Sequence, residues 1–123
     1  MEWTQARAII ASKIKVGTDV NTARSTYRFV RKTNAAMCRY GYNNELGFIV
    51  PVGKTACVGI PWSMLETCFQ GLAGATGYGG SWFRQHFALQ AKDRGCHVHV
   101  VGQLFVKAGL AKQRDNSYFS IDD

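Results

Sequence analysis

The spacing of apolar residues changes at Pro61, and this change constrains the fold more than any other feature of the sequence. From Thr26 to Ile60 the chain holds short runs of β-forming residues separated by turn formers, a pattern typical of an antiparallel meander. Beyond Pro61, apolar residues recur every three or four positions, as they do along one face of a helix. The strands expected before Pro61 are 27–32, 36–42, 47–52 and 55–60.

The segment before the meander is expected to form a helix. It carries an apolar stripe at helical spacing, formed by Trp3, Ala6, Ile10 and Ile14. The segment after Pro61 is also expected to be helical, because Ser63 and Glu66 have the spacing of a capping box.

A segment with five glycines, residues 71–80, then interrupts the helical pattern and predicts a loop. Helices are expected at 81–94 and 97–108, although the β-branched start of the latter leaves a strand as its alternative. A polar turn at 112–116 and a short strand at 117–121 follow.

These elements predict one α+β domain over residues 1–123, with a helix and an antiparallel meander in 1–60 and a helical region in 61–123. The chain has 123 residues, of which 46% are apolar and 19% charged, and this composition fits one globular domain. The sequence holds neither an apolar run of about 18 residues nor a secretory signal at its start. We therefore expect no membrane partner and a cytoplasmic location.

The order of the elements expected from residue 61 resembles the winged helix-turn-helix family. The likeness is carried by Val100–Ala111 and Tyr118–Ile121, because winged helices often end their recognition helix in a Leu…Gly-Leu pattern, followed by a charged wing and an aromatic strand. The resemblance implies a winged-helix-like region at 61–123 that binds DNA. It places His99, Gln103 and Lys107 on the recognition helix and Lys112 and Arg114 in the wing. The alternative is an ordinary solvated helix face.

The net charge of +7 favours a polyanionic partner. Most of the excess lies in residues 1–61, where basic residues alternate with aromatic ones such as Tyr27, Phe29, Tyr40 and Tyr42. Guanidinium groups suit phosphate, and aromatic rings can stack on bases. A second candidate nucleic-acid surface therefore comprises Arg24, Arg28, Arg31, Lys32 and Arg39. The alternative is that the rings lie in the core and the charges are merely solvated.

No catalytic motif is present. Gly53-Lys54-Thr55 lacks the glycine spacing of a phosphate-binding loop, and the cysteines Cys38, Cys57, Cys68 and Cys96 form no CxxC pair. Cys96, His97 and His99 are the best candidates for metal ligands, but they lack the spacing of a known zinc site. We expect no enzyme activity, no cofactor and no metal.

The sequence therefore favours a small basic nucleic-acid-binding or regulatory module, with DNA ahead of RNA as its partner and a homodimer as one assembly. One alternative is a protein–protein adaptor or homo-oligomer with Trp62, Trp82 and Phe87 exposed at its interface. Another is a small-ligand-binding protein whose pocket lies under the glycine-rich segment.

Overall fold

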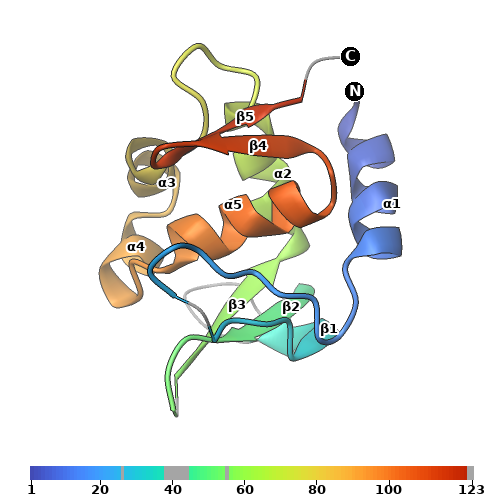
Figure 1. Cartoon of the computed structure of the whole chain (residues 1–123), viewed down its shortest axis with the longest axis vertical. Coiled ribbons are helices and arrows are strands. Elements are labelled where there is room, and N and C mark those ends of the chain that lie inside the picture. The colour runs from blue at the N-terminus through green and yellow to red at the C-terminus, as the bar shows by residue number, and fades with distance from the viewer. Residues whose placement is uncertain (26, 38–44, 55, 122–123) are drawn as a thin grey trace.

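The computed structural model describes residues 1–25, 27–37, 45–54 and 56–121 and confirms the expected α+β class (Figure 1). The N-terminal helix precedes a three-stranded antiparallel meander of order β1-β2-β3, and a two-stranded sheet, β4-β5, comes last. The elements are α1 (Trp3–Lys13), β1 (Lys32–Met37), β2 (Glu45–Pro51), β3 (Cys57–Pro61), α2 (Trp62–Gly71), α3 (Gly80–His86), α4 (Ala88–Asp93), α5 (His97–Lys107), β4 (Ala111–Arg114) and β5 (Ser117–Ser120).

The meander buries one face of β2 and β3. Phe48 pairs with Ile60 and Val50 with Val58, and all four side chains are buried. Alternate residues of a strand point to the same face, so this face joins the core. Strands were expected at 47–52 and 55–60, and the structure confirms both as β2 and β3, with shifts of one or two residues at their ends.

Helix α5 lies at the centre of the molecule. Figure 1 shows it between the meander and the β4–β5 hairpin, and it packs against α1, α4, β3 and β4. Residues 97–107 are helical, which decides the choice between helix and strand that the sequence left open. Its apolar residues are buried on several sides, as in a core helix rather than a surface helix: Val98, Val100, Val101, Leu104 and Phe105.

The expected strand 27–32 is wrong. Its residues pair back on the chain just after α1, with Val20 N–H donating to the Arg28 carbonyl at 3.1 Å and Val30 N–H to the Thr18 carbonyl at 2.9 Å. The result is an irregular hairpin over residues 17–31, which we call the 17–31 hairpin. Strand geometry there is limited to two isolated bridges, Asp19 with Phe29 and Thr22 with Ser25, and β1 begins only at Lys32.

Other expected boundaries also need correction. Ser63 lies inside α2, because β3 runs directly into the helix at Pro61 and no side chain caps it. The helix expected at 81–94 is divided at Phe87, whose backbone leaves helical geometry (φ −138°, ψ 56°) while its ring packs on Phe83 at 5.2 Å. The polar turn shortens to Asp115 and Asn116, since β4 continues to Arg114.

No helix in the described ranges combines the length and the apolar character that a membrane crossing requires. Three cysteines in those ranges, Cys57, Cys68 and Cys96, are free thiols, and Cys38 lies outside them.

Gly102, in the middle of α5, lies directly against the ring of Tyr118 in the β4–β5 hairpin. A Cβ at Gly102 would collide with the ring of Tyr118, which is fully buried. The hairpin can therefore pack on α5 in this way only because residue 102 has no side chain.

We expect Gly102→Ala to lower the free energy of unfolding by about 1–3 kcal/mol because of this overpacking, although helix propensity alone would favour alanine by about 1 kcal/mol. Urea unfolding measures the effect. The control is Gly74→Ala, where the nearest atom to the new Cβ would be the Gly71 carbonyl oxygen at 3.6 Å. A Gly102→Ala protein as stable as the wild type would contradict the packing of Tyr118 on α5.

Candidate functional site

Three adjoining depressions meet at Arg24. The largest, of about 640 Å³, lies beside the glycine-rich segment and reaches Arg84 and His99. A second, of about 380 Å³, contains Arg28, His99 and Asp115. The third, of about 490 Å³, continues from Arg24 and Arg28 to Lys54. Because Arg24 lines all three, we call these depressions together the basic groove.

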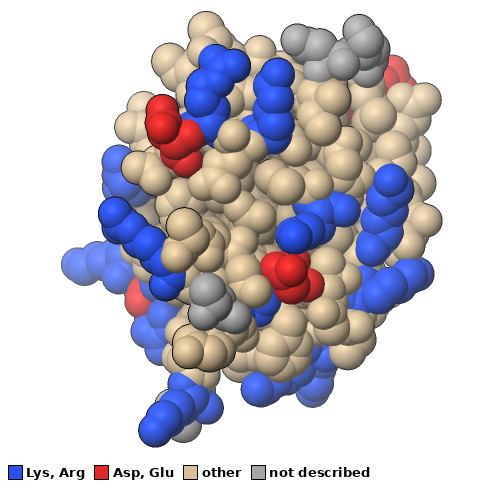
Figure 2. All heavy atoms as spheres, in the orientation of Figure 1, with Lys and Arg blue, Asp and Glu red and all other residues tan. Residues whose placement is uncertain are grey.

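The basic groove has an excess of positive charge. Arg24, Arg28, Lys54 and Arg84 line it, and Asp115 is the one acidic residue among its described lining residues. None of these four cations forms an ion pair with another described residue. Figure 2 shows Lys and Arg spread over this face of the molecule, with few Asp and Glu among them. Such an uncompensated surface attracts anions.

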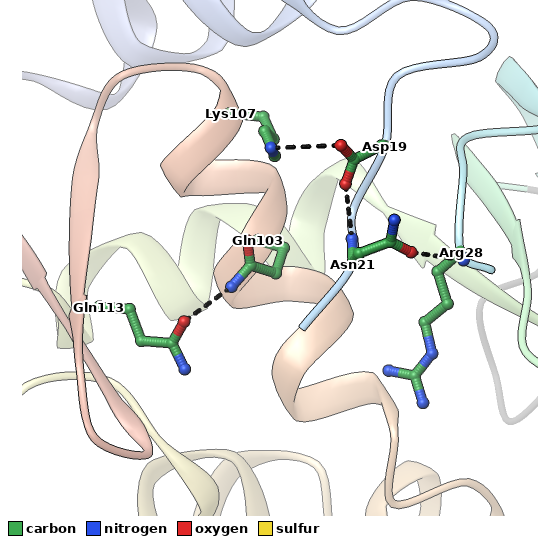
Figure 3. A network of polar contacts seen from close by, with 6 residues as sticks. All are labelled: Asp19, Asn21, Arg28, Gln103, Lys107 and Gln113. Carbon is green, nitrogen blue, oxygen red and sulfur yellow. Dashed lines mark hydrogen bonds and ion pairs between the residues drawn. The ribbon is translucent and has the colours of Figure 1, made fainter. Parts of the chain in front are cut away.

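A chain of polar contacts runs beneath the groove. His99 Nδ1 and the Tyr118 hydroxyl lie 2.9 Å apart, and Gln103 Nε2 donates to that hydroxyl at 3.3 Å and to Gln113 Oε1 at 3.0 Å (Figure 3). Buried polar groups need such partners, and the Gln103 side chain is only 5% exposed. Gln103 was expected on the DNA-contacting side of a recognition helix or on a solvated helix face, and its burial contradicts both expectations.

Burial and the charge of the basic groove both favour the neutral form of His99. Burial lowers the pKa of His99 below its ordinary value of 6.5, and the positive charges of Arg28 and Arg24 lower it further. Burial raises the pKa of the Tyr118 hydroxyl. Both side chains are therefore predominantly neutral at pH 7.

A second polar network anchors the 17–31 hairpin to α5 (Figure 3). Lys107 Nζ lies 3.5 Å from Asp19 Oδ2, and Asp19 Oδ1 accepts a hydrogen bond from Asn21 N–H at 2.9 Å. Asn21 Oδ1 in turn accepts from the backbone N–H of Arg28 at 2.7 Å. The Asn21 N–H lowers the pKa of Asp19, and the charge of Lys107 lowers it further. Lys107 is thus paired with the hairpin, while the Arg28 guanidinium extends away from this network.

The residues expected to bind nucleic acid are only partly brought together. Arg24, Arg28 and His99 meet in the basic groove. Arg31 and Lys32 are exposed but do not line it, and Arg39, Tyr40 and Tyr42 lie outside the described residues. Lys112 and Arg114 are exposed on β4, where the Arg114 guanidinium lies 5.5 Å from the centre of the Phe119 ring.

Sequence reasoning missed Lys54 and Arg84 as members of the groove. Lys54 lies in the connection between β2 and β3, and Arg84 lies on α3. Lys54 belongs to the Gly53-Lys54-Thr55 segment, which was rejected as a phosphate-binding loop, and Arg84 belongs to no marked pattern. Tertiary folding brings both residues to the groove that Arg24 lines.

The aromatic residues expected at an interface mostly contact other protein groups. Trp62 is 8% exposed and packs edge-on against Phe48 at 5.2 Å, so its expected exposure is wrong. Trp82 stacks on His86 at 4.2 Å. Within the part of the chain that the structure describes, no group of three His, Cys, Asp or Glu side chains is arranged to hold a metal.

Comparisons with models of protein families, with curated proteins and with solved structures find no match to this chain. The resemblance to winged helices therefore stays a prediction.

The lowered pKa of His99 has a consequence for stability. The unfolded chain takes up a proton on this imidazole near pH 6.5, before the folded protein does, so acid favours the unfolded state. We expect the free energy of unfolding to fall as the pH drops from 7.5 through 6.5 to the lower pKa of the folded state. The fall should be smaller in His99→Gln. Denaturant titrations at several pH values measure it, and equal pH profiles for the two proteins would contradict the lowered pKa.

Proposed function

We propose that this chain binds nucleic acid through the basic groove, in a binding or regulatory role without catalysis. The observation that carries the proposal is that three depressions share Arg24 and are also lined by Arg28, Lys54 and Arg84. Among their described lining residues, Asp115 is the single acidic one. A nucleic-acid backbone presents one negative charge per nucleotide, and an extended line of cations can displace several of its counterions.

The aromatic side chain of Tyr27 supports the same function. It is 88% exposed and lies beside Arg28 and Lys54 in the third depression. An exposed ring flanked by cations is the arrangement on which unpaired bases stack. DNA is the first partner to test, as the sequence favoured, and single-stranded DNA should bind at least as well as duplex.

A small anionic ligand is the second candidate. The largest depression, of about 640 Å³, contains Thr76, Ser81 and Arg84. This size is within the range of small-molecule sites. The depression is lined by glycines of the glycine-rich segment, which supports this alternative. A homodimer and an adaptor role stay predictions.

The paired variant Arg24→Gln, Arg28→Gln tests the groove. We expect the affinity of the wild type for a short single-stranded DNA to fall steeply between 50 and 200 mM salt. In the variant, affinity should drop roughly tenfold or more, and the slope of log affinity against log salt should lessen by about 1.5. Fluorescence anisotropy measures both, and unfolding should change by less than about 0.5 kcal/mol.

The matched control removes the same charge elsewhere. Lys13→Gln, Lys15→Gln alters exposed residues that do not line the groove, so affinity should fall less than about threefold. Equal losses in the two variants would show that only net charge matters. No binding by the wild type at 50 mM salt would reject nucleic acid as the partner.

The wing that the family resemblance implies can be tested independently. Lys112 and Arg114 lie on β4 and do not line the basic groove, so Lys112→Gln, Arg114→Gln should weaken binding to single-stranded DNA less than about threefold. The same anisotropy titration measures this. A loss as large as that of the Arg24, Arg28 pair would instead support DNA contact through a winged-helix hairpin.

A further inference from the structure

His99 occupies the junction of the basic groove. It lines both the depression that reaches Arg84 and the one that contains Arg28, and Arg24 belongs to both. Its ring is half-buried and lies in the first turn of α5, where the positive end of the helix dipole favours a nearby anion. Which of its two nitrogens carries the proton decides what this ring can offer to a ligand.

The hydrogen-bond chain beneath His99 fixes that choice, starting from a backbone carbonyl. The Asp115 carbonyl can only accept, so the Gln113 group that lies 2.9 Å from it is Nε2. Gln113 Oε1 therefore faces Gln103 and accepts from Gln103 Nε2 at 3.0 Å. The orientation of each side-chain amide follows from its neighbour, as amide assignments should.

The same reasoning assigns the proton of the His99 imidazole. Gln103 Nε2 also donates to the Tyr118 oxygen at 3.3 Å, and among the described residues His99 Nδ1, at 2.9 Å, is the only acceptor that the Tyr118 hydroxyl contacts. Because Tyr118 is buried and a buried hydroxyl proton needs an acceptor, the hydroxyl donates to Nδ1. Nδ1 is then an acceptor, and the neutral ring carries its proton on Nε2. A second proton on Nδ1 would displace the Tyr118 hydroxyl, which agrees with a neutral His99.

The Nε2–H of His99 is available to a ligand. It has no hydrogen-bond partner among the described residues and is not among their buried polar atoms that lack partners. The charged groups that line the groove around His99 are Arg24, Arg28, Arg84 and Asp115, with the thiol of Cys96 beside them. A neutral N–H donor among cations suits an oxygen of an anion, and it repels those cations less than a charged ring would.

We propose that Arg24, Arg28 and His99 form a phosphate subsite, in which His99 donates its Nε2–H to a phosphate oxygen and Tyr118 acts as the positioning residue that holds the ring in this tautomer. The proposal rests on the function proposed above and names the group of the nucleic acid that this part of the groove holds. The two guanidinium groups supply charge, and His99 supplies a directed donor.

Imidazole NMR of the wild type at pH 7.5 tests the tautomer directly. We expect His99 to be protonated on Nε2, and its Nε2 resonance to shift when a short single-stranded DNA is added. In Tyr118→Phe, which keeps the aromatic ring over Gly102 but removes the hydroxyl, the tautomer should become mixed. A merely structural role for Tyr118 would leave the tautomer unchanged, and an Nδ1–H tautomer in the wild type would overturn the proposal.

Affinity measurements complete the test. His99→Phe, which cannot donate, should weaken DNA binding roughly tenfold, whereas the control His86→Phe changes an exposed histidine that does not line the groove and should leave affinity within about twofold. DNA binding that depends on Arg24 and Arg28 but not on His99 would overturn the subsite and leave the proposed function intact.

A titration with inorganic phosphate distinguishes the phosphate subsite from the proposed binding of nucleic acid. If inorganic phosphate shifts the His99 Nε2 resonance while DNA does not bind, the subsite stands and the partner is a small phosphate-bearing ligand instead of nucleic acid. If neither phosphate nor DNA shifts it, the subsite is rejected.

Discussion

The burial of α5 is the constraint on which the rest of the structure depends. A helix with apolar residues around most of its circumference cannot lie on a surface, and here α1, α4, β3 and β4 all pack against it. The missing side chain of Gly102 lets the ring of Tyr118 approach the helix closely, which draws the β4–β5 hairpin over it. The surrounding elements of the fold thus cover one central helix, α5.

Burial of α5 also explains the polar chain beneath the basic groove. A glutamine in a core helix must satisfy its amide inside the protein, and Gln103 does so through Gln113 and Tyr118. Tyr118 in turn contacts His99, which lies one turn before Gln103 and reaches the surface. The packing of the hairpin on the helix and the tautomer of the groove histidine therefore depend on the same side chain.

The positive charge of the groove comes from segments that are distant in the sequence. The 17–31 hairpin supplies Arg24 and Arg28, the β2–β3 connection supplies Lys54, and α3 supplies Arg84. Asp19 of the hairpin contacts Lys107 of α5 and the backbone of Asn21. One of the cations expected to bind a ligand is therefore paired with an acid of the protein itself.

The sequence by itself determined the α+β class and the approximate position of the meander and the helices, because hydrophobic periodicity is a local property. It also singled out Arg24, Arg28 and His99 by their chemistry, but on two separate candidate surfaces. Only the tertiary structure decided that the helix 97–107 is a core element, that Gln103 is buried and Lys107 is paired, and that Lys54 and Arg84 join the groove. Which side of a helix is covered, and which cations meet, depends on contacts between residues far apart in the chain, and no local pattern encodes them.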